Sequence, residues 1–296
     1  MLQMSENEIK ALIRLLDDPD GSVYKAVKKK IISYGANILP DLTKAWQDAK
    51  AAGNGNALLM ARFERIVPLL QTNLLVNLID EWKANPHDLR HIAWLVSRFE
   101  YFALDRQKFD DTLDSLKEMI PAYALGNFTP LEQIKIFNNS FFRRMGFKAV
   151  SLSDYYNPNN CSPDHVINTK IGNPVSLAFV YMLLAEEVGL PVYGVNLPKN
   201  FILAYSDDRK KADFYINPMS NGVVFERNEI DRFLQDIHLK PEQQFYAPCD
   251  TITIIKRLLC RLELSYRNHN DTHNSDVALR AYKTLGEPLT GHIDWE

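Results

Sequence analysis

The sequence has 296 residues, of which 46% are hydrophobic and 24% are charged, and its formal net charge at pH 7 is -3. These shares are ordinary for a globular protein with a real core, and the length is enough for two domains. Because a dedicated nucleic-acid-binding protein usually presents a clustered positive face, the small negative charge disfavours that class of protein.

The cysteines and the apolar stretches bear on where the protein is found. Three cysteines, an odd and low number, give no disulfide framework of the kind that small secreted proteins use. The first residues lack the basic and apolar regions of a secretory signal, and the most apolar stretch, 175–185, is too short to span a bilayer. We therefore expect a cytoplasmic protein with neither a membrane nor a nucleic-acid partner.

Residues 1–120 have the hydrophobic spacing of successive helices. From Ile9 to Leu116 apolar residues recur every three or four positions, which is the period of an amphipathic helix. The Asp-Asp-Pro-Asp turn that begins at Asp17 resembles the turn between paired helices of HEAT-like repeats. The pattern predicts a helical, HEAT-like N-terminal region over 1–120, with a linker at 51–56.

The regular helical spacing of hydrophobic residues ends after residue 120, and we predict a second domain over 121–247. A helix is expected to begin at Thr129-Pro130, where Thr129 can cap it, and a strongly apolar helix is expected at 172–189. Four runs read as strands, at 192–197, 201–205, 213–217 and 223–225. The order predicts a helix packed on an antiparallel sheet and then a helical tail over 248–296, so the expected fold class is α+β and predominantly helical.

Several short motifs follow one another between Phe137 and Gly222. They read Phe137-Asn138, Gly146-Phe147, Asp154-Tyr155-Tyr156-Asn157-Pro158, Gly172-Asn173-Pro174-Val175-Ser176-Leu177, Gly189-Leu190-Pro191-Val192 and Asn200-Phe201. In this order they resemble the SirB-type transglutaminase-like proteins, which are similar to the transglutaminase and papain-like superfamily. The resemblance implies a cysteine at the start of a buried helix, a histidine base from the next strand and an aspartate from the strand after it.

Residue by residue, the resemblance places other side chains at all three triad positions. Pro174 stands where the cysteine is expected, Asn200 where the histidine is expected, and Asn217 where the aspartate is expected. Proline carries no nucleophile, and an amide is not a useful base. We therefore predict that the triad chemistry is absent.

Ser176, Cys161 and His165 are candidates to replace the triad. Ser176 lies near Pro174, but no histidine follows it until His238. Cys161 precedes a helix start at Ser162-Pro163, a setting that can lower the pKa of a thiol, and His165 follows four residues later. Cys161 with His165 is the best surviving nucleophile and base.

One histidine pair has the spacing of metal ligands. His87 and His91 are one helical turn apart, a spacing that can bind a metal, but no further ligands are visible in the sequence. We predict neither a metal site nor a cofactor.

The favoured interpretation is a non-catalytic transglutaminase-like protein that binds a protein or peptide partner. The predicted cleft lies at the start of the Pro174 helix and is lined by Tyr155, Tyr156, Asn173, Asn200 and Asn217, whose amides and hydroxyls suit hydrogen-bonded recognition. The alternative is a cysteine-dependent hydrolase or acyl or amide transferase that uses Cys161 and His165. A purely structural domain is the third possibility.

Overall fold

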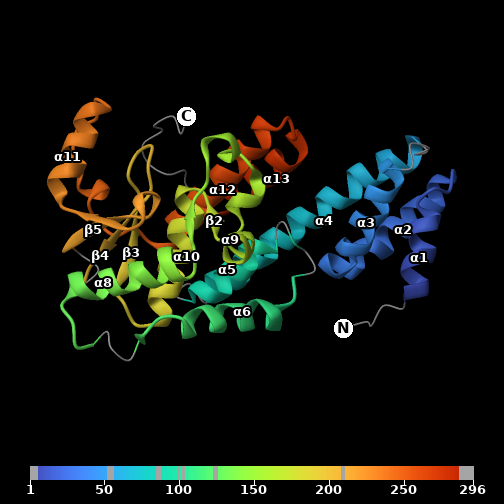
Figure 1. Ribbon diagram of the computed structural model, residues 1–296. Helices are drawn as coiled ribbons and strands as arrows, with labels where there is room; N and C mark the ends of the chain where they lie inside the picture. The colour runs from blue at the N-terminus through green and yellow to red at the C-terminus, as the bar shows by residue number, and fades with distance from the viewer. Residues whose placement is uncertain are drawn as a thin grey trace. The chain divides into compact units, whose positions relative to one another are not determined.

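The computed structural model describes residues 6–51, 57–84, 88–98, 101, 104–122, 126–207 and 211–286 (Figure 1). The chain forms two compact units, one within Met1–Ala84 and Tyr101–Ala103 and the other within Asn85–Glu100 and Leu104–Glu296. His87 and most of the predicted linker at 51–56 lie outside the described residues. The predicted domain boundaries after residues 120 and 247 stay predictions.

The described part of the first unit is helical, as the hydrophobic period predicted. Its helices are α1 (Glu6–Leu15), α2 (Gly21–Tyr34), α3 (Leu39–Ala51) and α4 (Ala57–Ala84), with a short 3-10 helix, η1, at Gly35–Ile38. Asp20 caps α2, because its carboxylate accepts a hydrogen bond from the Ser22 amide at 2.7 Å. Arg62 on α4 donates to the Leu16 carbonyl at 2.6 Å, so α4 supports the turn between α1 and α2. The HEAT-like assignment of this region stays a prediction.

The second unit contains the longer list of elements. Its helices are α5 (Leu89–Ser97), α6 (Arg106–Glu118), α8 (Pro130–Asn138), α9 (Pro163–Thr169), α10 (Pro174–Glu187), α11 (Arg227–Asp236), α12 (Thr251–Asn268) and α13 (Thr272–Thr284). A π-helix, η2 (Asn139–Arg144), continues α8, and the 3-10 helices are η3 (Leu152–Asp154), η4 (Pro158–Cys161), η5 (Pro218–Ser220) and η6 (Gln243–Phe245). The helical tail that the sequence predicted corresponds to α12 and α13, which pack against each other.

A small antiparallel sheet confirms the four predicted strands. Its strands, in the order in which they are paired, are β3 (Val192–Val195), β4 (Ile202–Tyr205), β5 (Phe214–Asn217) and β6 (Val223–Phe225). The register pairs Gly194 with Leu203, Leu203 with Ile216 and Ile216 with Val224. A separate parallel pair joins β1 (Lys148–Ala149) to β2 (Ile171–Gly172).

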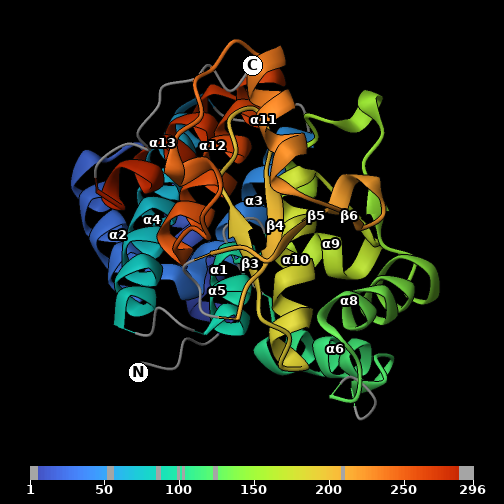
Figure 2. The same cartoon turned by 90° about the vertical axis from the view of Figure 1, so that its left-hand side faces the viewer.

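Helix α10 is the centre of the second unit. Every residue from Val175 to Ala185 is buried, because β3 and β4, α12, α9 and α6 all pack around this helix (Figures 1 and 2). Such a helix must be apolar on all faces, which explains why its sequence is so uniformly hydrophobic. The hydroxyl of its buried Tyr181 donates to Asn138 Oδ1 at 2.8 Å, and burial raises the pKa of Tyr181.

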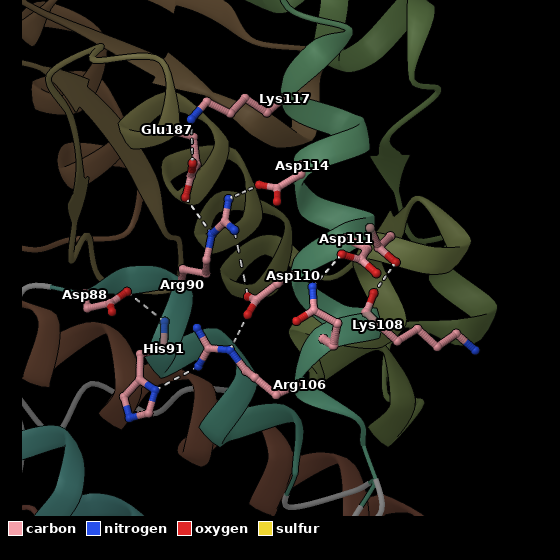
Figure 3. A network of polar contacts seen from close by, with 12 residues as sticks. Asp88, Arg90, His91, Arg106, Lys108, Asp110, Asp111, Asp114, Lys117 and Glu187 are labelled. Carbon is pink, nitrogen blue, oxygen red and sulfur yellow. Dashed lines mark hydrogen bonds and ion pairs between the residues drawn. The ribbon is translucent and has the colours of Figure 1, made fainter.

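Charged side chains join the far end of α10 to α5 and α6 (Figure 3). Arg90 on α5 lies 2.8 Å from Glu187 at the end of α10 and 2.6 Å from Asp114 on α6. Lys117 on α6 reaches the other oxygen of Glu187 at 3.1 Å. These ion pairs fix the three helices relative to one another at the end opposite to the start of α10.

Among the described residues, no helix is both long enough and apolar enough to cross a membrane.

Candidate functional site

The start of α10 is built from a closed set of hydrogen bonds. Asn173 is the N-cap, and its Oδ1 accepts from the amides of Val175 and Ser176, each at 3.0 Å. Ser176 Oγ in turn accepts from the Asn173 amide at 3.1 Å and donates to the Asn160 carbonyl. Pro174 occupies the first helical position, where its missing N–H costs nothing. The free amides that a helix start usually offers are therefore already satisfied by the cap.

A cavity opens beside this helix start. Its volume is about 50 Å³, room for a few water molecules or one small polar group. It is lined by Tyr155, Pro174, Val175, Lys199, Asn200, Phe201, Arg257, Cys260, Arg261 and Leu264. The lining comes from α10, from the loop before β4, from the segment after η3 and from one face of α12.

The structure brings three of the predicted residues together at this cavity. Pro174, Asn200 and Tyr155 all line it, although they are far apart in the sequence. Asn200 precedes β4, and its Oδ1 accepts from the neighbouring Phe201 amide at 2.8 Å. Asn200 and Pro174, at the start of α10, thus line the same cavity.

The other predicted cleft residues lie elsewhere. Asn173 is buried in the helix cap, and Asn217 at the end of β5 caps η5 by accepting from the Met219 amide at 3.0 Å. Tyr156 does not line the cavity, and its ring packs edge-on against that of Tyr155. None of the three is a lining residue.

Helix α12 supplies residues that the sequence analysis missed. Arg257 is buried and donates to the carbonyls of Asn200 at 2.7 Å and Leu197 at 3.4 Å. Burial lowers the pKa of Arg257 to about 10, so its guanidinium is still charged at neutral pH. Arg261 donates to the Tyr155 carbonyl at 3.3 Å, and its guanidinium lies 3.8 Å from the centre of the Tyr155 ring.

The spacing of these α12 residues was a signal that sequence reasoning could have used. Arg257, Cys260, Arg261 and Leu264 recur at intervals of three or four, which places them on one face of a helix. Lys199, the remaining basic residue of the cavity, lies in a loop and carried no such pattern.

The predicted nucleophile and base do not line the cavity. Cys161 is only 2% exposed, and its Sγ accepts from Asn173 Nδ2 at 3.2 Å and lies 3.7 Å from Ser265 Oγ. His165 lies in α9, where burial lowers the pKa of its imidazole and the charge of Asp164 opposes that shift. Ser176 is fully buried within the cap network.

Cys260 and His91 are two further groups with reactive or metal-binding side chains. Cys260 lines the cavity, and burial raises the pKa of its thiol to about 11, so it is not a thiolate at neutral pH. His91 Nδ1 lies 2.9 Å from Arg106. The described residues contain no group of three or more His, Cys, Asp or Glu side chains placed to hold a metal ion.

Comparison with known proteins connects the second unit to one family. The family described as "Transglutaminase-like superfamily" matches residues 106–260, which is more than half of the chain. This match spans α6 to the middle of α12 and so includes most of the residues around the cavity.

Individual relatives agree with that match. A UPF0162 protein of Xylella fastidiosa (strain 9a5c) is 27% identical over 190 residues, which cover 62% of this chain and 66% of the relative. A UPF0162 protein of Vibrio cholerae is 27% identical over 136 residues, covering 44% of this chain and 48% of the relative. F-box only protein 21 of Mus musculus is 31% identical over 68 residues, covering 23% of this chain and 11% of that protein. The match thus spans just under two thirds of the first relative's length, and no solved structure matches the chain.

Proposed function

Because this chain belongs to the transglutaminase-like superfamily, we propose that it is a non-catalytic, SirB-type member that binds a polar ligand, part of a protein or peptide, at the start of α10. The relatives named UPF0162 carry no stated activity that could be transferred to it. The proposal therefore depends on the chemistry of the residues around the cavity.

The observation that carries the proposal is Pro174 at the first position of α10, facing the cavity. An acyl-transfer enzyme needs a nucleophile there and amide donors for the developing oxyanion. Pro174 offers neither a nucleophile nor an N–H, and Asn173 occupies the amides of Val175 and Ser176. The same cavity can still hold a ligand by hydrogen bonds from Asn200 and contact with Tyr155.

Asn200 fits a binding role better than a catalytic one. Its amide has no useful basicity, but it can both donate and accept hydrogen bonds to a ligand. Asn217 is engaged with the Met219 amide and does not line this cavity.

The alternative enzyme would use Cys161 and His165. A nucleophilic thiol must reach its substrate, whereas Cys161 is 2% exposed and is enclosed by Asn173 and Ser265. The low exposure of this thiol favours the binding role over thiol catalysis.

A kinetic experiment separates the two functions. Hydrolysis and aminolysis of an activated thioester and of a peptide p-nitroanilide are measured with the wild type and with Cys161→Ala and His165→Ala. We expect all three to match the uncatalysed rate, because no described nucleophile faces the cavity with a base beside it. Cys249→Ala, which removes a partly buried thiol that does not line the cavity, is the matched control for folding.

The contrary result would be turnover by the wild type that Cys161→Ala loses and Cys249→Ala keeps. That outcome would establish the thiol enzyme and remove the binding proposal.

We also propose a cytoplasmic location. Cys161, Cys249 and Cys260 are thiols in the structure, which fits a reducing compartment.

A further inference from the structure

The charged residues that line the cavity beside α10 are all positive. Of its ten lining residues, Lys199, Arg257 and Arg261 are cationic, and none is an aspartate or glutamate. Clustering like charges in a partly enclosed space is unfavourable unless an opposite charge is present for at least part of the time. The cavity therefore has the electrostatics of an anion site.

Arg261 provides a second, independent observation. The contacts of its guanidinium among the described residues are uncharged, namely the Tyr155 carbonyl and the rings of Tyr155 and Tyr156. Its Nε is buried and has no hydrogen-bond acceptor among the described residues. A buried N–H without an acceptor is uncommon and calls for an explanation, which a bound oxygen ligand would supply.

The neighbouring residues hold this cation in place. Arg257 lies one turn earlier on α12 and is anchored by the Asn200 and Leu197 carbonyls, so its charge cannot swing away from the cavity. Tyr155 packs over the Arg261 guanidinium and orients its plane. Lys199 also lines the cavity and is exposed to solvent.

We propose that the cavity binds an oxyanion, a carboxylate or phosphate group, through Arg261 and Arg257 with Lys199 at the entrance. This inference rests on the binding role proposed above and names the chemical class of its ligand. The volume of about 50 Å³ admits the acid group alone, so the rest of the ligand lies outside the cavity. Guanidinium groups suit this ligand because their planar forks match carboxylate and phosphate oxygens.

Cys260 lines the same cavity and serves as a reporter of its charge. The wild type is treated with three methanethiosulfonate reagents. The transferred thioalkyl group carries a negative sulfonate in the first and a positive trimethylammonium in the second, and it is an uncharged methyl group in the third. Labelling of Cys260 is followed by peptide mass spectrometry. We expect the sulfonate reagent to react about tenfold faster than the trimethylammonium reagent, or more, because a cationic cleft concentrates anions. Taking this ratio cancels any change in the intrinsic reactivity of the thiol.

Two variants on α12 test whether the charge of Arg261 causes the difference in labelling rate. Arg261→Gln removes the charge but keeps a polar side chain, and we expect the ratio to fall about threefold or more. Arg267→Gln, an exposed arginine on the same helix, is the matched control and should leave the ratio unchanged.

Competition identifies the source of the oxyanion. Inorganic phosphate and acetate are each added at constant ionic strength, with sodium chloride as the reference. Saturable protection of Cys260 by phosphate supports a phosphate ligand, and protection by acetate supports a carboxylate ligand.

The outcomes separate this inference from the proposed function. Equal rates for the two charged reagents, or protection no greater than that given by chloride, would overturn the oxyanion site and leave a neutral ligand in place. If even the uncharged reagent cannot label Cys260 in the folded protein, the cavity is closed and the binding role itself fails.

Discussion

At the scale of one residue, Asn173 determines which backbone amides remain free at the start of α10. A helix start of an enzyme usually directs its unpaired amides at a nucleophile or an anion. Here Asn173 Oδ1 takes two of those amides, and Asn173 Nδ2 also donates to Cys161 Sγ. One buried side chain thus closes the helix start and holds the nearest thiol.

This arrangement predicts a large cost for removing the cap. Asn173→Ala would leave the Val175 and Ser176 amides buried without an acceptor, so we expect the free energy of unfolding to fall by about 2–3 kcal/mol. The matched control is Asp250→Ala, which removes an exposed cap from α12 and should cost about 1 kcal/mol. Urea denaturation measures both. A loss for Asn173→Ala no larger than for Asp250→Ala would mean that the cap is not the support described here.

At the scale of elements, α5, α6 and α10 are joined by the ion pairs of Arg90 (Figure 3). Burial opposes the charge of this guanidinium, but its hydrogen bonds to Asp114 and Glu187 outweigh that effect and raise the pKa of Arg90. The hydrogen bond from Arg90 lowers the pKa of Asp114. The network is only partly exposed, so it contributes more than an isolated surface ion pair would.

Arg90→Ala is expected to lower the free energy of unfolding by about 1–3 kcal/mol at pH 7, because Glu187 loses a charged partner. The sign of the pH dependence follows from Asp114. Its pKa is depressed in the folded state, so the stability it contributes is present above its ordinary pKa of 3.8 and is lost as the pH falls through the lower, folded value. The difference between wild type and variant should therefore hold at pH 5 and shrink below pH 3.8. Urea titrations across this range measure it, and a difference that grows with acid would refute the network.

At the same scale, some helices and strands could be predicted from the sequence alone and others could not. The strands and α10 were predictable, because turn residues bound runs of β-branched and aromatic residues and because α10 is uniformly apolar. The cationic face of α12 was missed, because only its apolar positions were used to predict the helix. A single sequence does not reveal that α12 returns to pack against the start of α10, which is a long-range contact.

For the whole molecule, the second unit carries the family match and the cavity, and the described residues of the first unit are mainly helical. The resemblance pointed to three positions, Pro174, Asn200 and Asn217, and two of them, Pro174 and Asn200, line one cavity. Asn217 does not, because its short side chain is used to cap η5 one residue later. Local capping of this kind competes with long-range roles and depends on the backbone at each position.

The most direct test of the account is whether a ligand binds in the cavity and whether its binding depends on the Asn200 side chain. Saturation-transfer difference NMR is recorded with a mixture of dipeptides, with free and with amidated C-termini, on the wild type and on Asn200→Ala and Asn217→Ala. Asn200 lines the cavity, and the group that holds Arg257 is its backbone carbonyl, so Asn200→Ala should weaken binding without releasing the arginine. The account predicts transfer signals in the wild type and Asn217→Ala that are lost or strongly reduced in Asn200→Ala. No signal in the wild type, or equal signals in all three proteins, would contradict it.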